Sequence, residues 1–254
     1  MAEQKDKNGR RAKSLKTAAK KTAGTSVQNA APKSKKETKP KKKSDLSRKK
    51  LVKQVGETLR KTYPNPSCAL THRSPFELLV ATMLSAQCTD KQVNKCTDVL
   101  FPKYNTPEAF AAMDFETLEP YIKSCGFYRM KGEHILAMSR ILLEQYGGRV
   151  PQTREELTKL PGVGRKTANV VLSNAFKVPA IAVDTHVFRV ANRIGLTEAK
   201  DVEKTERQLM AHIPEQDWGD AHHWLIYHGR QVCAAQRPKC PDCPLKEICE
   251  HAVH

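Results

Sequence analysis

Residues 160–168 read LPGVGRKTA, and the two glycines of this segment constrain the local fold more than any other feature of the chain. Gly162 and Gly164 allow a tight turn without steric conflict from Cβ atoms. Such a turn leaves backbone N–H groups free to bind an anion, and the helix that follows adds the positive end of its dipole. The pattern predicts a phosphate-binding turn with Lys166 directly behind it. An amine beside a phosphate site indicates chemistry on a nucleic-acid backbone.

Positive charge is concentrated at the start of the chain. Residues 1–50 hold 18 Lys and Arg against 4 Asp and Glu and no aromatic residue, while the formal net charge of all 254 residues is +17. Such a segment buries too little apolar surface to fold alone, so we expect a disordered Lys-rich tail that is attracted to nucleic acid. A solubilising extension is the alternative. A cleaved organelle-targeting peptide is disfavoured, because the basic residues are mostly lysines and no apolar face is evident.

The apolar content of the chain bears on its compartment. No run of 18 apolar residues is present, so we expect neither a membrane span nor a membrane partner. We also find no secretory apolar segment, which indicates a reducing compartment and makes the eight cysteines poor candidates for disulfides.

From Leu51 onward the sequence shows helical patterns and no alternating strand pattern, which predicts an all-α fold. Ser74, Pro75 and Glu77 form a capping box with proline at the first helical position. We expect further helix starts at Thr106, Asp114 and Thr153, and a helix over residues 130–146 that ends at the glycine pair 147–148.

A second motif lies near the C-terminus, where four cysteines occur with the spacing C-x6-C-x2-C-x5-C at Cys233, Cys240, Cys243 and Cys249. In a reducing compartment four thiols in one proline-rich loop predict a metal site. Zinc is the usual choice for four cysteines, but it commonly takes two separated Cys-x2-Cys pairs. The asymmetric spacing fits a larger inorganic cluster at least as well. The other cysteines (Cys68, Cys88, Cys96 and Cys125) are scattered through helical segments and are expected to be small core residues.

The segment LPGVGRKTA, the segment AVDTHVFRV at residues 182–190 and the cysteine loop together resemble the bacterial endonuclease III family. Members of that family are helix-hairpin-helix DNA glycosylases with a [4Fe–4S] cluster. The resemblance covers roughly residues 51–254. It implies a six-helix domain over 68–178 and a cluster domain that combines 51–67 with 179–254. The active-site cleft would lie between the two domains.

The resemblance implies a bifunctional enzyme of base excision repair that removes oxidised pyrimidines from duplex DNA. It assigns Lys166 as the nucleophile that forms a Schiff base with C1′ and Asp184 as the catalytic carboxylate. Their chemistry fits, because a carboxylate stabilises positive charge on the sugar and a neutral amine attacks C1′ before β-elimination. Taken alone, Lys166 would more often be a solvated lysine. Asp184 would be the N-cap of the next helix, and we expect it to be both cap and catalyst.

An enzyme of this kind must flip its target nucleotide out of the duplex and fill the gap. The resemblance points to Gln87, at the end of a helix, and to Phe127, a wedge position at which relatives often carry leucine. Phe127 is as readily a core aromatic. Asp90 either contacts the flipped base or caps a helix, and capping is favoured. We expect Gly162, Gly164 and Arg165 to make non-specific contacts with DNA.

The resemblance also implies a binding partner and leaves alternative functions to consider. The partner is double-stranded DNA with a damaged pyrimidine or an abasic site, bound by a monomer in the bacterial cytoplasm at the nucleoid, or in a nucleus for a eukaryotic source. The cluster would shape a basic loop through Arg237, Lys239 and Lys246. An adenine-mismatch glycosylase and a thymine-mismatch or uracil glycosylase are disfavoured, because they do not need Lys166. A non-enzymatic DNA-binding scaffold is the alternative from another class.

Removing residues 1–50 should flatten the salt dependence of DNA binding. Each Lys or Arg that neutralises a phosphate releases a counterion, so the affinity of a protein with this tail should fall steeply as salt rises. The measurement is the slope of the logarithm of the association constant against the logarithm of salt concentration, for the full and shortened chains. An unchanged slope would show that the tail makes no phosphate contacts.

Overall fold

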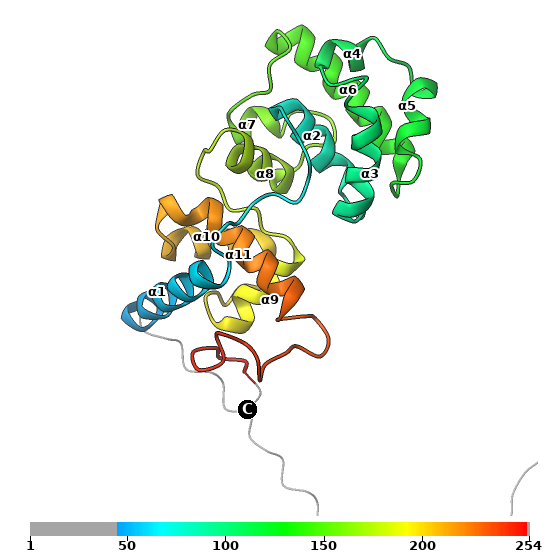
Figure 1. Cartoon of the computed structure of the whole chain (residues 1–254). Helices are drawn as coiled ribbons and strands as arrows, with labels where there is room; N and C mark the ends of the chain where they lie inside the picture. The colour runs from blue at the N-terminus through cyan, green and yellow to red at the C-terminus, as the bar shows by residue number, and fades with distance from the viewer. Residues whose placement is uncertain (1–44, 253–254) are drawn as a thin grey trace, which may run out of the picture. The chain divides into compact units, whose positions relative to one another are not determined.

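The computed structural model describes residues 45–252, which form eleven α-helices, one 3-10 helix and no strand (Figure 1). The predicted all-α fold is thereby confirmed for this part of the chain. The prediction of a disordered tail is wrong for residues 45–50, which form the first turn and a half of α1 (Asp45–Thr62), and the rest of the predicted tail lies outside the described residues. Within residues 45–252, no helix is both long and apolar enough to cross a membrane.

Seven helices surround a first hydrophobic core, which takes its buried residues from Leu70 to Ala180. These helices are α2 (Pro75–Leu84), α3 (Asp90–Leu100), α4 (Pro107–Ala111), α5 (Phe115–Ile122), α6 (Tyr128–Tyr146), α7 (Arg154–Leu157) and α8 (Arg165–Ala175), and Figure 1 shows them from cyan to yellow-green. The resemblance implies six helices here, and the structure also contains the one-turn α7. Helix α2 is buried over almost its entire length, because it packs against α3, α6 and α8.

Side-chain caps fix where these helices begin. Ser74, Thr106, Asp114 and Thr153 each accept a hydrogen bond from the backbone N–H three residues ahead, as predicted. Each such cap contributes about 1 kcal/mol. Helix α6 ends at Gly147, whose φ of 56° is left-handed. The caps and the glycine set helix lengths that the apolar stripes alone would leave open.

A second core is built from α1, α9 (Thr185–Ile194), α10 (Val202–His212) and α11 (Trp218–Gln231), and the 3-10 helix η1 (Glu215–Asp217) directly precedes α11. Helix α9 presents an apolar stripe in which Val187, Val190 and Ile194 are buried, and it ends at Gly195 with φ 93°. Leu51, Val55 and Leu59 of α1 pack into the same core. Residues that precede α2 therefore belong with residues that follow α8.

Buried polar contacts join the helix α8 to this second group. Glu206 of α10 is 3% exposed and accepts two hydrogen bonds from Arg165, at 2.7 and 2.9 Å. Arg154 contacts the same carboxylate at 3.4 Å. The buried Asn169 donates to the carbonyl of Ile181 at 3.0 Å. A buried carboxylate needs such partners, so these bonds hold the start of α8 in a defined place.

Candidate active site

Lys166 and Asp184 both line a cavity of about 80 Å³. Lys166 comes from the first turn of α8, and Asp184 immediately precedes α9. Helices α2 and α11 supply further lining residues, which include Thr82, Ser85, His222, His223, Tyr227 and Arg230. Residues that are distant in sequence therefore meet around one small space.

The glycine turn sets the position of Lys166. Gly162 has φ 73°, which favours glycine, and a Cβ there would lie 2.9 Å from Met83 Cε and from His134 Nδ1. Gly164 is the N-cap of α8 and offers no side-chain cap to its N–H groups. A Cβ at Gly164 would meet no protein atom within 4 Å. Protein packing thus explains Gly162, whereas Gly164 leaves the exposed helix start open to a close approach from outside.

Asp184 is the N-cap of α9, as predicted, and one of its oxygens does the capping. Oδ1 accepts hydrogen bonds from the backbone N–H groups of His186 and Val187, both at 2.8 Å. Oδ2 lies 3.4 Å from His186 Nδ1, but that nitrogen makes no hydrogen bond of acceptable geometry. The helix therefore orients the carboxylate and leaves Oδ2 available to the cavity. His186 is a half-buried histidine beside the site.

A pair of buried histidines on α11 forms part of the wall. The rings of His222 and His223 lie 3.9 Å apart, and His223 Nε2 donates to Asn174 Oδ1 at 2.8 Å. This direction follows because the Asn174 amide nitrogen already donates to the Val170 carbonyl. Burial lowers the pKa of His222 to about 3 and the pKa of His223 to about 4. Both rings are therefore neutral near pH 7 and add no positive charge beside Lys166.

Gln87 and Phe127 lie on two turns that face a second cavity, of about 230 Å³, together with Gly162. Both residues have left-handed backbones, with φ 52° and 58°, and both are exposed. Phe127 is 62% exposed, so the alternative of a core aromatic is wrong. Gln87 lies in the turn after α2 rather than at the helix end. The structure thus gathers the predicted DNA-inserting residues beside the glycine turn.

Two other residues have partners that the sequence did not reveal. Thr89, and not Asp90, caps α3, so the favoured interpretation of Asp90 is wrong. Asp90 instead pairs with Arg230 of α11 at 2.8 Å on the wall of the first cavity. Arg165, predicted to contact DNA, donates hydrogen bonds from Nε and Nη2 to the carboxylate of Glu206. His222, His223, Asn174 and Arg230 were missed altogether, because no local motif marks them.

The four C-terminal cysteines line one cavity with His228 and Arg193. Arg193 of α9 contacts Cys233 Sγ at 3.7 Å and donates to the carbonyl of Ala234 at 2.7 Å. Burial raises the pKa of the Cys243 and Cys249 thiols. Among residues 45–252, no three His, Cys, Asp or Glu side chains are grouped closely enough to hold a metal ion. The thiols thus share a cavity without converging on a single point. The nearby Arg237, Lys239 and Lys246 are exposed.

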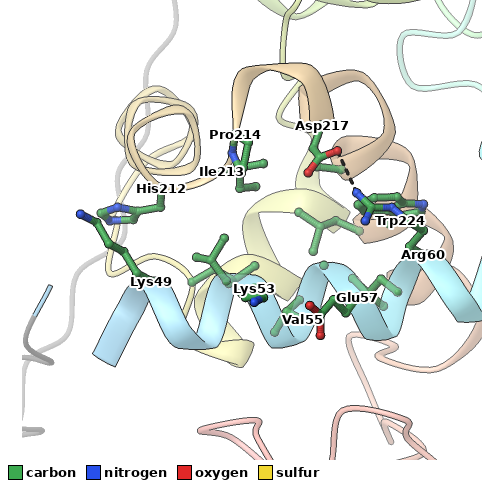
Figure 2. Close-up of a pocket in the computed structure, with 16 residues that line it drawn as sticks. Lys49, Lys53, Val55, Glu57, Arg60, His212, Ile213, Pro214, Asp217 and Trp224 are labelled. Atoms are coloured by element: carbon green, nitrogen blue, oxygen red, sulfur yellow. Dashed lines mark hydrogen bonds and ion pairs between the residues drawn. The ribbon is translucent and has the colours of Figure 1, made fainter. Parts of the chain in front are cut away.

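Another cavity, of about 370 Å³, lies between α1 and the segment from α10 to α11 (Figure 2). Arg60 closes one end: it pairs with Asp217 at 2.8 Å and lies 5.3 Å above the Trp224 ring. Neither Lys166 nor Asp184 lines this space. Its floor is apolar core, so its size does not make it the reaction site.

The chain is similar to known base excision repair proteins in both sequence and structure. The family described as "HhH-GPD superfamily base excision DNA repair protein" matches residues 80–215. Endonuclease III of Bacillus subtilis (strain 168) is 54% identical over 188 residues, which are 74% of this chain and 86% of that protein. Endonuclease III of Escherichia coli (strain K12) is 50% identical over 193 residues, 76% of this chain and 92% of that protein. A solved structure, a trapped covalent intermediate of endonuclease III with DNA, has a TM-score of 0.77 at 50% identity and covers 80% and 96% of the two chains.

The buried histidines predict that the free energy of unfolding falls as the pH drops below 6.5. Above that pH, imidazole is neutral in both the folded and unfolded chain. Below it the unfolded chain binds protons, whereas folded His222 and His223 bind them only near pH 3 and pH 4. Each histidine should cost about 1.4 kcal/mol per pH unit in this window. Urea unfolding between about pH 6.5 and 5, above most carboxylate titration, measures the slope. An equal slope in His222→Asn/His223→Asn would contradict this origin.

Proposed function

Since the chain belongs to the endonuclease III family of the HhH-GPD superfamily of base excision DNA repair proteins, we propose that it removes oxidised pyrimidines from duplex DNA through a Schiff base on Lys166. It is a DNA glycosylase and abasic-site lyase of base excision repair. One observation carries the proposal: Lys166 and Asp184, from separate helices, line the same cavity. A non-enzymatic DNA-binding scaffold would have no need for that convergence.

Asp184 and Lys166 have different roles in the proposed reaction. Cleavage of the N-glycosidic bond develops positive charge on the sugar, and Asp184 Oδ2 is the carboxylate oxygen that its helix leaves available. The Lys166 amine, once it has given up its proton, attacks C1′, and the resulting imine acidifies the C2′ hydrogens. Loss of a C2′ proton then expels the 3′ phosphate by β-elimination. The neutral His222 and His223 add no charge that would compete with the cationic sugar for Asp184.

DNA binding is proposed on the surface that carries the glycine turn. The open space at Gly164 and the uncapped start of α8 suit a backbone phosphate. Gln87 and Phe127, exposed on neighbouring turns, are placed to fill the gap left by a flipped nucleotide. The hydrogen bonds from Arg165 to Glu206 limit the contact that this side chain can make with DNA. We propose that a monomer binds a duplex with a damaged pyrimidine or an abasic site in the bacterial cytoplasm.

We also propose that the two cores correspond to a domain over residues 68–178 and a cluster domain over 51–67 and 179–254. The cluster would be [4Fe–4S], held by Cys233, Cys240, Cys243 and Cys249. Four thiols that line one cavity but do not converge on a point suit a polynuclear group better than a single zinc ion. When bound, the cluster would cross-link the C-terminal loop, and residues of α9 anchor that loop through its carbonyls.

Borohydride trapping tests the nucleophile. On a duplex that contains thymine glycol, the protein should form a covalent adduct that is lost in Lys166→Gln, because only a free amine can form the imine. Strand nicking should fall by at least about a hundredfold. Lys159→Gln, an exposed lysine seven residues earlier, is the matched control and should trap normally. An adduct that persists in Lys166→Gln would assign the chemistry to another amine.

Replacement of Asp184 by Asn separates its two roles. Asparagine caps helices as well as aspartate, so the free energy of unfolding should change by less than about 1 kcal/mol. Base release should fall about 10²- to 10³-fold, because the charge that stabilises the cationic sugar is gone. Single-turnover base release and thermal unfolding measure the two effects. Full activity in a folded Asp184→Asn would show that Asp184 is only a cap.

A further inference from the structure

Three cysteine thiols lie beneath the two turns that carry Gln87 and Phe127. Cys88 directly follows Gln87, and Cys125 directly precedes Gly126. Cys96, on α3, completes the group. This cluster of Cys88, Cys96 and Cys125 is separate from the C-terminal cysteine loop, and the reaction proposed above uses none of its sulfurs.

The two turns are in contact at the positions next to these thiols. A Cβ on Gly126 would lie 3.5 Å from the carbonyl oxygen of Gln87, an ordinary van der Waals distance. Cys125 Sγ is 3.7 Å from Cys96 Sγ, and it also lies within hydrogen-bonding reach of Cys88. Cys125 thus contacts both other thiols and connects the turn before α6 to the turn after α2.

The three thiols differ in their access to solvent. Cys125 is fully buried and Cys96 is 5% exposed, with its sulfur 3.1 Å from Ser124 Oγ. Cys88 is only half-buried. A dissolved reagent therefore reaches Cys88 first. The buried Cys125 is the partner that can then attack the modified Cys88.

A buried cation lies beside the same sulfurs. Lys131 is 5% exposed, and its ammonium donates to the Leu84 carbonyl at 2.7 Å. Burial lowers the pKa of Lys131, and the nearby Cys125 and Cys88 oppose that shift. Burial also raises the pKa of Cys125, so this thiol stays protonated until it reacts.

We propose that Cys88 and Cys125 form a redox-active dithiol, which a low-molecular-weight disulfide converts into an intramolecular disulfide that ties the two turns together. The effect on DNA rests on the proposed function, whereas the thiol chemistry does not. In a reducing compartment, such a disulfide is transient and regulatory rather than structural.

The exchange balances in two steps. The Cys88 thiolate attacks one sulfur of oxidised glutathione, forms a mixed disulfide and releases one glutathione thiolate. Cys125 then gives up its proton and attacks Cys88 Sγ in the mixed disulfide, which expels the second glutathione thiolate. Two protein thiols are oxidised, one disulfide bond of the reagent is reduced, and the two thiol protons pass to the released glutathiones.

The bond should weaken the grip on damaged DNA. A disulfide between Cys88 and Cys125 must hold their sulfur atoms about 2.05 Å apart, which draws the two turns together. The cavity of about 230 Å³ between Gln87 and Phe127 lies at this junction and should narrow. Both residues hold left-handed backbones, so their turns have few alternative conformations with which to compensate. The oxidised protein should therefore insert both side chains into a duplex less readily.

The test uses the full holoprotein treated with oxidised glutathione. Peptide mapping by mass spectrometry should find a cross-link between the Cys88 and Cys125 peptides that dithiothreitol reverses. Affinity for a duplex with a tetrahydrofuran abasic analogue should fall about tenfold on oxidation, equivalent to roughly 1.4 kcal/mol. The cross-link and the loss of affinity should vanish in Cys88→Ser and persist in Cys96→Ser, the matched control from the same cluster.

Three results would overturn the proposal: no cross-link, a cross-link between Cys96 and Cys125 instead, or a cross-linked protein with unchanged affinity. Cleavage of a true abasic duplex by the reduced protein is measured in parallel. If the reduced protein fails to cleave that duplex while the oxidised protein forms the Cys88–Cys125 cross-link, the proposed function is rejected and the dithiol is retained. If the reduced protein cleaves normally but oxidation produces no cross-link, the dithiol is rejected and the proposed function is retained.

Discussion

The two hydrogen bonds that Asp184 Oδ1 accepts from the N–H groups of His186 and Val187 determine much of the site. They satisfy the start of α9 and fix the plane of the carboxylate. Because Oδ1 is fully engaged, Oδ2 is the oxygen that remains for a developing positive charge. Lys166 enters the same cavity from the start of α8, where a glycine turn replaces a side-chain cap. Two helix starts, one capped and one open, thus supply the acidic and the basic group.

Buried polar contacts hold these two helix starts in place. Glu206 is almost wholly buried and is bound by Arg165, the neighbour of Lys166. Asn169 on the same helix donates to the carbonyl of Ile181, three residues before Asp184. Loss of one partner of a buried charged pair is costly, so such bonds favour one arrangement strongly. Hydrophobic packing builds each core, and these few polar contacts connect α8 with α9 and α10.

Features governed by local sequence were predictable. The capping residues and the end of α6 at Gly147 depend on neighbours within a few positions, and the structure confirms them. The partners of Asp90 and Arg165 were not predictable, because Arg230 and Glu206 approach only when distant helices pack. The same reason hid His222 and His223, whose burial depends on α8 and whose sequence resembles an ordinary helix face. Phe127 was ambiguous because exposure of an aromatic residue is a tertiary property.

The proposed reaction requires that an extruded deoxyribose occupies the cavity lined by Lys166 and Asp184. A crystal structure of Lys166→Gln with a duplex that contains a tetrahydrofuran abasic analogue tests it most directly. The analogue should lie in that cavity, with its C1′ facing residue 166 and Asp184 Oδ2, and with Gln87 and Phe127 inserted in the base stack. An analogue that stays within the DNA helix, or lies in the cavity shown in Figure 2, would show that Lys166 and Asp184 do not form the reaction site.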